Sequence, residues 1–134
     1  MANRPYFVIA GLPTDDKSLA EYDIKGLYGL DSNVARDQLV AMHAALKEAG
    51  YGFSMVHVSP QLGTGPLTDA LGQADHCDGV ILGYGIRGHP YPQITALLEE
   101  LIAAVRRHPK DPKILFNWGI PSTVDACKRA LGQF

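Results

Sequence analysis

The sequence has few cysteines and no long apolar run. No run reaches the roughly 18 apolar residues needed to span a bilayer, and the first residues lack the apolar core of a secretory signal. We therefore expect no membrane association and a cytoplasmic location. The two cysteines, Cys77 and Cys127, lie far apart and outside any CxxC or Cys/His pattern. This predicts neither a disulfide framework nor a zinc site, so both are interpreted as small buried residues.

A large excess of charge of either sign is also absent. The chain carries 12 Lys and Arg against 14 Asp and Glu, a net charge of −2, and its basic residues form no dense stripe of the kind that binds a phosphate backbone. We therefore expect no nucleic-acid partner. A length of 134 residues with 46 % hydrophobic composition allows one domain that buries a core without staples. We expect that domain to span residues 1–134.

Four short apolar runs are typical of strands covered on both faces. They lie at residues 6–10, 53–58, 79–83 and 113–117. Helical patterns follow these runs at residues 33–49, 67–75 and 92–108. A fourth helix is predicted from Ser122 onward, because Ser122 and Asp125 have the spacing of a capping box. Alternating strands and helices predict an α/β domain with three layers, Rossmann-like or flavodoxin-like, whose parallel sheet has the order 2-1-3-4. Ligands bind such sheets at the carboxyl ends of the strands, here between the first and third.

A glycine-rich segment follows the third strand. Gly83, Gly85 and Gly88 spell GxGxxG, a spacing found in dinucleotide-binding turns. In dinucleotide-binding proteins, however, such a turn follows the first strand, and the second strand ends in an acid that holds the ribose. Here the turn follows the third strand, and the fourth strand ends in Asn117. We therefore predict a flexible binding loop and no cofactor, with NAD(P) as an alternative.

Three side chains around this loop suit acid/base chemistry. Arg87 offers a planar fork for a carboxylate or phosphate, and His89 can move protons near neutral pH. Asn117 could hold a carbonyl oxygen on which charge develops. We interpret Arg87 as an anion clamp, His89 as the general acid/base and Asn117 as the oxyanion partner. The alternative is a plain turn in which Arg87 pairs with an acid of the same domain.

The segment of residues 12–32 is longer than an ordinary strand-to-helix connection. It is acidic and aromatic, and Gly26 and Gly29 give it hinges. At the carboxyl end of a strand, such a segment could close over a ligand as a lid and exclude water. A dimer contact and a passive surface loop are the alternatives.

Further ligand-binding candidates share this edge of the predicted sheet. They are Gly11, Tyr28, Tyr84, Gly85, Gly88, Trp118 and Ser122. For Trp118 the alternative is packing, and for Ser122 it is helix capping alone. The sequence contains no GxSxG, HExxH or P-loop pattern, so covalent and metal-dependent chemistry have no positive support, and we predict no metal ligands.

The run of residues 78–88, with Phe116, Asn117 and residues 123–126, resembles small single-domain Rossmann-like proteins of bacteria and fungi. The likeness covers most of the chain from the first strand onward. It implies the same fold and transfers no activity, substrate or cofactor to this chain.

Three hypotheses about function follow. The first is an enzyme of hydrolase, lyase or isomerase type that acts by acid/base chemistry on a small anionic or carbonyl-containing metabolite. The second is a module that binds a nucleotide, a dinucleotide or another phosphate without catalysis, or an NAD(P)-dependent oxidoreductase. The third is an assembly subunit, since four strands leave a sheet edge open and a homodimer would cover it.

Overall fold

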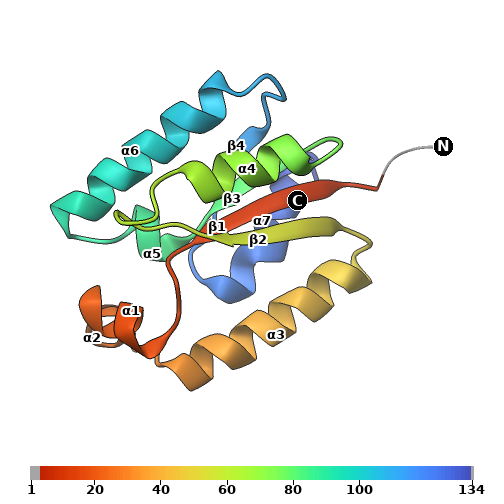
Figure 1. The fold of residues 1–134 in the computed structure, drawn as a ribbon. Helices are drawn as coiled ribbons and strands as arrows, with labels where there is room; N and C mark the ends of the chain where they lie inside the picture. Colours follow the sequence, from red (N-terminus) through yellow and green to blue (C-terminus); the bar gives the residue numbers. More distant parts are fainter. Residues whose placement is uncertain (1–3, 134) are drawn as a thin grey trace.

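The protein folds around one parallel sheet with the strand order β2-β1-β3-β4. A computed structural model describes residues 4–133. Residues 1–3 lie outside that range. They belong to the N-terminal segment, in which we predicted no secretory signal. The strands are β1 (Tyr6–Gly11), β2 (Gly52–His57), β3 (Gly79–Leu82) and β4 (Lys113–Phe116). All three pairings are parallel, which confirms the predicted α/β fold of Rossmann or flavodoxin type (Figure 1).

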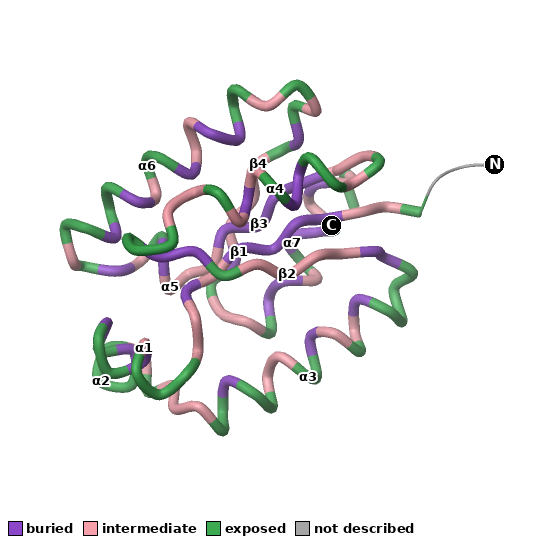
Figure 2. Tube along the Cα trace, in the orientation of Figure 1, coloured by how far each residue is buried: buried purple, intermediate pink, exposed green. Residues whose placement is uncertain are grey.

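Long helices cover both faces of this sheet (Figure 1). On one face lie α3 (Ser32–Glu48) and α7 (Thr123–Ala130), and on the other α4 (Gly65–Gln73) and α6 (Pro92–Arg107). Side chains of β1 alternate between the two cores because successive residues of a strand point to opposite faces. Phe7 and Ile9 pack toward α3 and α7, whereas Val8 and Ala10 pack toward α4 and α6. The central strands β1 and β3 are accordingly the most deeply buried, whereas the edge strands β2 and β4 are mostly half-buried (Figure 2).

Four short helical elements lie where the sequence predicted none. The long segment after β1 contains α1 (Asp16–Glu21) and α2 (Ile24–Tyr28), and a 3-10 turn, η1 (Ile120–Ser122), precedes α7. The glycine-rich segment is not an open loop, because it forms the short helix α5 (Tyr84–Arg87). The amides of Ile86 and Arg87 both donate to the carbonyl of Gly83.

Ser122 directly precedes α7 as predicted, but its side chain makes no capping hydrogen bond to the helix. Its hydroxyl accepts a hydrogen bond from the Trp118 amide and donates to the Gly119 carbonyl, so it stabilises the turn before α7 instead of the first turn of the helix.

β2 and β4 form the two edges of the sheet. An open sheet edge is the reason for which we predicted a homodimer, and that dimer stays a prediction. Within residues 4–133, no helix has both the length and the hydropathy to cross a membrane.

Candidate functional site

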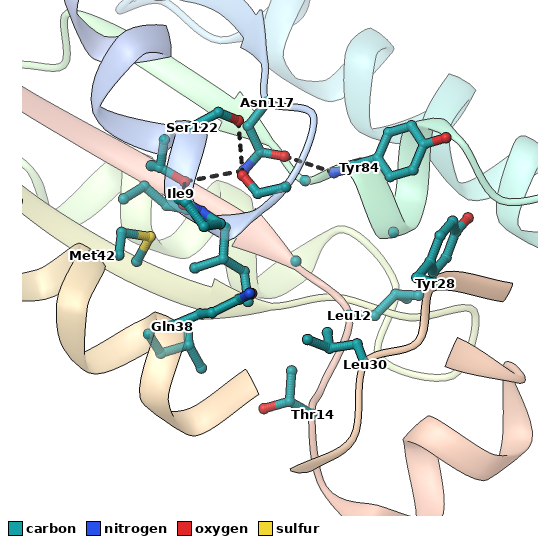
Figure 3. A pocket seen from close by; sticks show the side chains of 18 of the residues that line it. Ile9, Leu12, Thr14, Tyr28, Leu30, Gln38, Met42, Tyr84, Asn117 and Ser122 are labelled. Atoms are coloured by element: carbon teal, nitrogen blue, oxygen red, sulfur yellow. Dashed lines mark hydrogen bonds between the residues drawn. The ribbon is translucent and has the colours of Figure 1, made fainter. Parts of the chain in front are cut away.

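A cavity of about 510 Å³ lies at the carboxyl end of the sheet. The ends of β1, β3 and β4 border it, together with α3 and the segment that contains α1 and α2 (Figure 3). The cavity therefore lies where the chain turns from one side of the sheet to the other, the usual ligand position in such folds. Its volume falls within the range of pockets that hold small organic molecules.

Glycines stand at the ends of two neighbouring strands, and one of them leaves this space open. Ala10 is paired with Leu82, and the next residue along the chain is a glycine in each case, Gly11 at the end of β1 and Gly83 directly after β3. A Cβ atom at Gly83 would lie 3.4 Å from the Ala10 carbonyl oxygen, whereas one at Gly11 would meet no atom within 4 Å. Position 11 faces the same side of the sheet as Ile9, which borders the cavity. The missing side chain at Gly11 thus keeps the cavity open beside the sheet.

The lining of the cavity is mainly aliphatic. Its aliphatic and methionine side chains include Ile9, Leu12, Leu19, Ile24, Leu30, Leu39, Met42, Met55 and Ile120. Its polar side chains are Thr14, Tyr28, Gln38, Tyr84, Asn117, Ser122 and Thr123. No Asp, Glu, Lys, Arg, His or Cys of the described residues borders it. Because an unpaired charge is costly in apolar surroundings, this lining favours a ligand that places no charge inside.

Asn117 borders the cavity but also holds three segments together. It is 5 % exposed, its Oδ1 accepts from the Tyr84 amide at 2.8 Å, and its Nδ2 donates to Thr123 Oγ1 at 3.1 Å. Thr123 Oγ1 in turn donates to the Ile120 carbonyl (Figure 3). These bonds connect the end of β4 with the first residues of α5 and α7. Both polar atoms of the amide that we predicted as an oxyanion partner are therefore engaged.

Arg87 is exposed and does not border the cavity. Its Nη2 donates to the Asn117 carbonyl at 3.2 Å, and its guanidinium carbon lies 4.9 Å from the Tyr84 ring centroid and 5.8 Å from that of Phe116. As the alternative to an anion clamp, the sequence allowed a pairing of Arg87 with an acid of the same domain. Among residues 4–133 no acid is within ion-pair distance of Arg87. The structure thus gives Arg87 aromatic and carbonyl partners.

His89 is 4 % exposed and lies outside the cavity lining. Its Nδ1 accepts from the Tyr91 amide at 3.1 Å, and its Nε2 is 2.7 Å from the Tyr22 carbonyl oxygen, to which it can donate. The rings of Tyr22, Tyr28 and Tyr91 pack edge-on around it. Both ring nitrogens of the predicted general acid/base therefore serve main-chain groups, and they join the start of α6 to the segment after β1.

The segment after β1 forms one wall of the cavity. Leu19, Tyr22 and Ile24 from α1, α2 and their connection are buried. The Tyr22 hydroxyl donates to Gln61 Oε1 at 2.6 Å, and Gln61 Nε2 donates to Glu21 Oε1 at 2.9 Å. This segment covers the cavity in the conformation described, and its role as a lid stays a prediction.

Tyr28 and Tyr84 both border the cavity, as predicted ligand-binding residues, and their ring centroids are 5.2 Å apart. The Tyr28 hydroxyl is buried and has no hydrogen-bond partner among the described residues. Burial raises the pKa of Tyr28, and the neighbouring Tyr84 raises it further. The phenol is therefore protonated at neutral pH, and its hydroxyl lies at the end of the ring that points away from the cavity (Figure 3).

The other predicted residues divide between the cavity and its surroundings. Gly11, Gly85, Trp118 and Ser122 border the cavity, whereas Gly88 does not. A Cβ at Gly88 would lie 2.5 Å from a ring carbon of Tyr84, so this glycine makes room for that ring. Sequence reasoning missed Thr14 and Gln38, whose positions along the chain gave no signal.

No three His, Cys, Asp or Glu side chains within residues 4–133 are grouped so that they could hold a metal ion. Comparison of the sequence with protein-family models and with curated proteins gave no match. The cavity and its lining are therefore the basis for a functional proposal.

Proposed function

We propose that this domain binds a small, mainly apolar organic molecule that carries a carbonyl or similar acceptor oxygen. The observation that supports this most directly is the cavity at the strand ends, which glycine keeps open and which no charged side chain of the described residues borders. Of the two metabolite classes predicted from the sequence, the carbonyl-containing class fits this interior best.

One polar side chain is available to orient such a molecule. Gln38 reaches the cavity from α3 and makes no hydrogen bond within residues 4–133, so its amide can both donate and accept (Figure 3). A ligand with an acceptor oxygen can therefore bond to Gln38 without breaking a hydrogen bond of the described residues.

Acid/base catalysis on the bound molecule has less support than binding, because no Asp, Glu, Lys, His or Cys of the described residues borders the cavity. The catalytic roles of His89 and Arg87 stay predictions, and neither side chain borders the cavity. Turnover of hydrolase, lyase or isomerase type is thus a narrower hypothesis within the binding function.

A cavity-filling variant tests the proposal. Gly11→Leu places an isobutyl group where a Cβ would meet no atom within 4 Å, and Gly72→Leu makes the same change at an exposed, equally open glycine on α4. A thermal-shift screen should include ketones, lactones, alcohols, carboxylic acids and nucleotides. A ligand at one hundred times its Kd stabilises the wild type by about 2.7 kcal/mol, roughly 5–10 °C for a domain of this size.

We expect Gly72→Leu to keep this shift and Gly11→Leu to lose it while remaining folded. If a ligand shifts Gly11→Leu as much as the wild type, it binds elsewhere and the proposal is wrong. A shift caused by nucleotides alone and removed by Arg87→Ala would favour the phosphate-binding hypothesis instead.

A further inference from the structure

Two arginine side chains bond to carbonyl groups at the carboxyl end of β4 and have no carboxylate partner within residues 4–133. Arg129 Nη2 donates to the Phe116 carbonyl at 2.6 Å, and Arg87 Nη2 donates to the carbonyl of the next residue, Asn117, at 3.2 Å. The one ion pair found within residues 4–133 joins His76 to Asp78, just before β3 at the other end of the sheet. The positive charge of both guanidiniums is therefore not neutralised by the described part of the chain.

Arg129 lies against Trp118, a residue that borders the cavity. Its guanidinium carbon lies 5.3 Å from the ring centroid of Trp118, which is still 62 % exposed. The Trp118 amide donates to Ser122 Oγ at 2.9 Å, which fixes the backbone of this turn. Trp118 thus borders the cavity and also contacts the guanidinium of Arg129.

The guanidinium of Arg129 is oriented but not saturated. Arginine has five N–H donors in a planar fork, and one bond to the Phe116 carbonyl leaves others free. Stacking over an indole restricts the guanidinium and leaves its edge open, so less conformational entropy is lost when an anion binds. A carboxylate or a phosphate has the geometry to accept two parallel bonds from such a fork.

We propose that the ligand of the cavity is an amphipathic acid whose head group binds Arg129 beside Trp118. The apolar body of this acid lies among the aliphatic residues of the interior, and its charge stays outside, where the uncharged lining places no penalty on it. This inference rests on the proposed function. It adds the position of the ligand's head group and the negative charge that this group carries. It assigns the head group to Arg129, a residue on α7 that the sequence did not single out.

Matched acids and amides test the inference. Octanoate and octanamide share one alkyl chain and differ in charge, and octyl phosphate shows whether a phosphate head group also fits. Trp118 is the single tryptophan of the chain, so its fluorescence reports binding next to it directly. A charge-assisted hydrogen bond contributes about 1.5–3 kcal/mol, so we expect octanoate to bind about 10- to 100-fold more tightly than octanamide.

Three variants separate the possible causes of that preference. We expect Arg129→Gln to remove it without weakening octanamide binding, and Arg129→Lys to retain part of it, since lysine keeps the charge but not the planar fork. Arg106→Gln, at an exposed position in the last turn of α6, is the matched control and should bind like the wild type. Circular dichroism shows whether each variant is folded.

The outcomes distinguish this inference from the proposed function. Equal affinity for octanoate and octanamide would overturn the inference and leave the apolar cavity as a binding site. A larger loss in Arg87→Gln than in Arg129→Gln would overturn the assignment to Arg129. If neither compound changes the Trp118 fluorescence or the melting temperature, while the wider screen also gives no shift, the proposed function fails and the inference fails with it.

Discussion

At the scale of single residues, the chemistry of a side chain and its surroundings lead to different expectations. His89 follows a glycine-rich segment, the usual setting of a catalytic histidine, but in the fold it is 4 % exposed and bonded through both ring nitrogens. Asn117 likewise uses its amide to join two helix starts. Residue type alone could not show this, because one partner of each group, Tyr22 for His89 and Tyr84 for Asn117, is distant in the chain.

His89→Ala should therefore destabilise the protein. The substitution removes two buried hydrogen bonds and leaves a space among three tyrosine rings, at a cost of about 2–4 kcal/mol. Urea denaturation followed by circular dichroism measures this loss. His57→Ala, at the exposed last residue of β2, is the control and should change stability by less than about 0.5 kcal/mol. Equal stability of the two variants would show that His89 is not the structural link described.

At the scale of elements, length and periodicity decided which helices could be predicted. The sequence predicted a helix over residues 92–108, and α6 spans Pro92–Arg107, with proline in its first turn as expected. By contrast, α1, α2 and α5 have six, five and four residues, too short for a periodic pattern or for stability on their own. They form because side chains such as Leu19, Ile24 and Ile86 are buried against the rest of the domain.

Gln61→Ala should loosen the wall of the cavity that α1 and α2 form. Gln61 accepts from the Tyr22 hydroxyl and donates to Glu21, so it ties this segment to the connection after β2. We expect amide hydrogen exchange of residues 16–28 to become about five- to tenfold faster, which corresponds to the loss of about 1 kcal/mol of local stability. Gln93→Ala, exposed on α6, is the control. Unchanged exchange in Gln61→Ala would mean that buried apolar contacts alone hold the segment.

At the scale of the whole molecule, several groups that ionise in alkali are shielded from solvent. Burial raises the pKa of Cys127 from about 9 to about 12, and it also raises the pKa values of Tyr22, Tyr28 and Tyr51. Above about pH 9 the unfolded chain loses protons that the folded protein keeps, so the free energy of unfolding falls as pH rises.

The stability of the protein should therefore be nearly constant from pH 7 to about pH 9 and then decrease steadily toward pH 12. Urea midpoints at a series of pH values measure this. Cys127→Ala removes one of the ionising groups and should make the decrease less steep. A wild-type stability that stays flat above pH 10 would contradict the sign of the raised pKa values.

Local patterns along the chain were sufficient for the parallel sheet, its strand order and the edge at which a cavity lies. Strand burial, helix periodicity and the glycines at positions 11 and 83 depend on neighbouring residues, so one sequence carries them. The partners of side chains were decided only in three dimensions. His89 meets Tyr22, and Arg129 meets Phe116 and Trp118, because the sheet and its crossovers bring distant segments together. The function of a polar residue depends on these partners, and the tertiary structure placed His89 in the packing and the Arg129 guanidinium against Trp118.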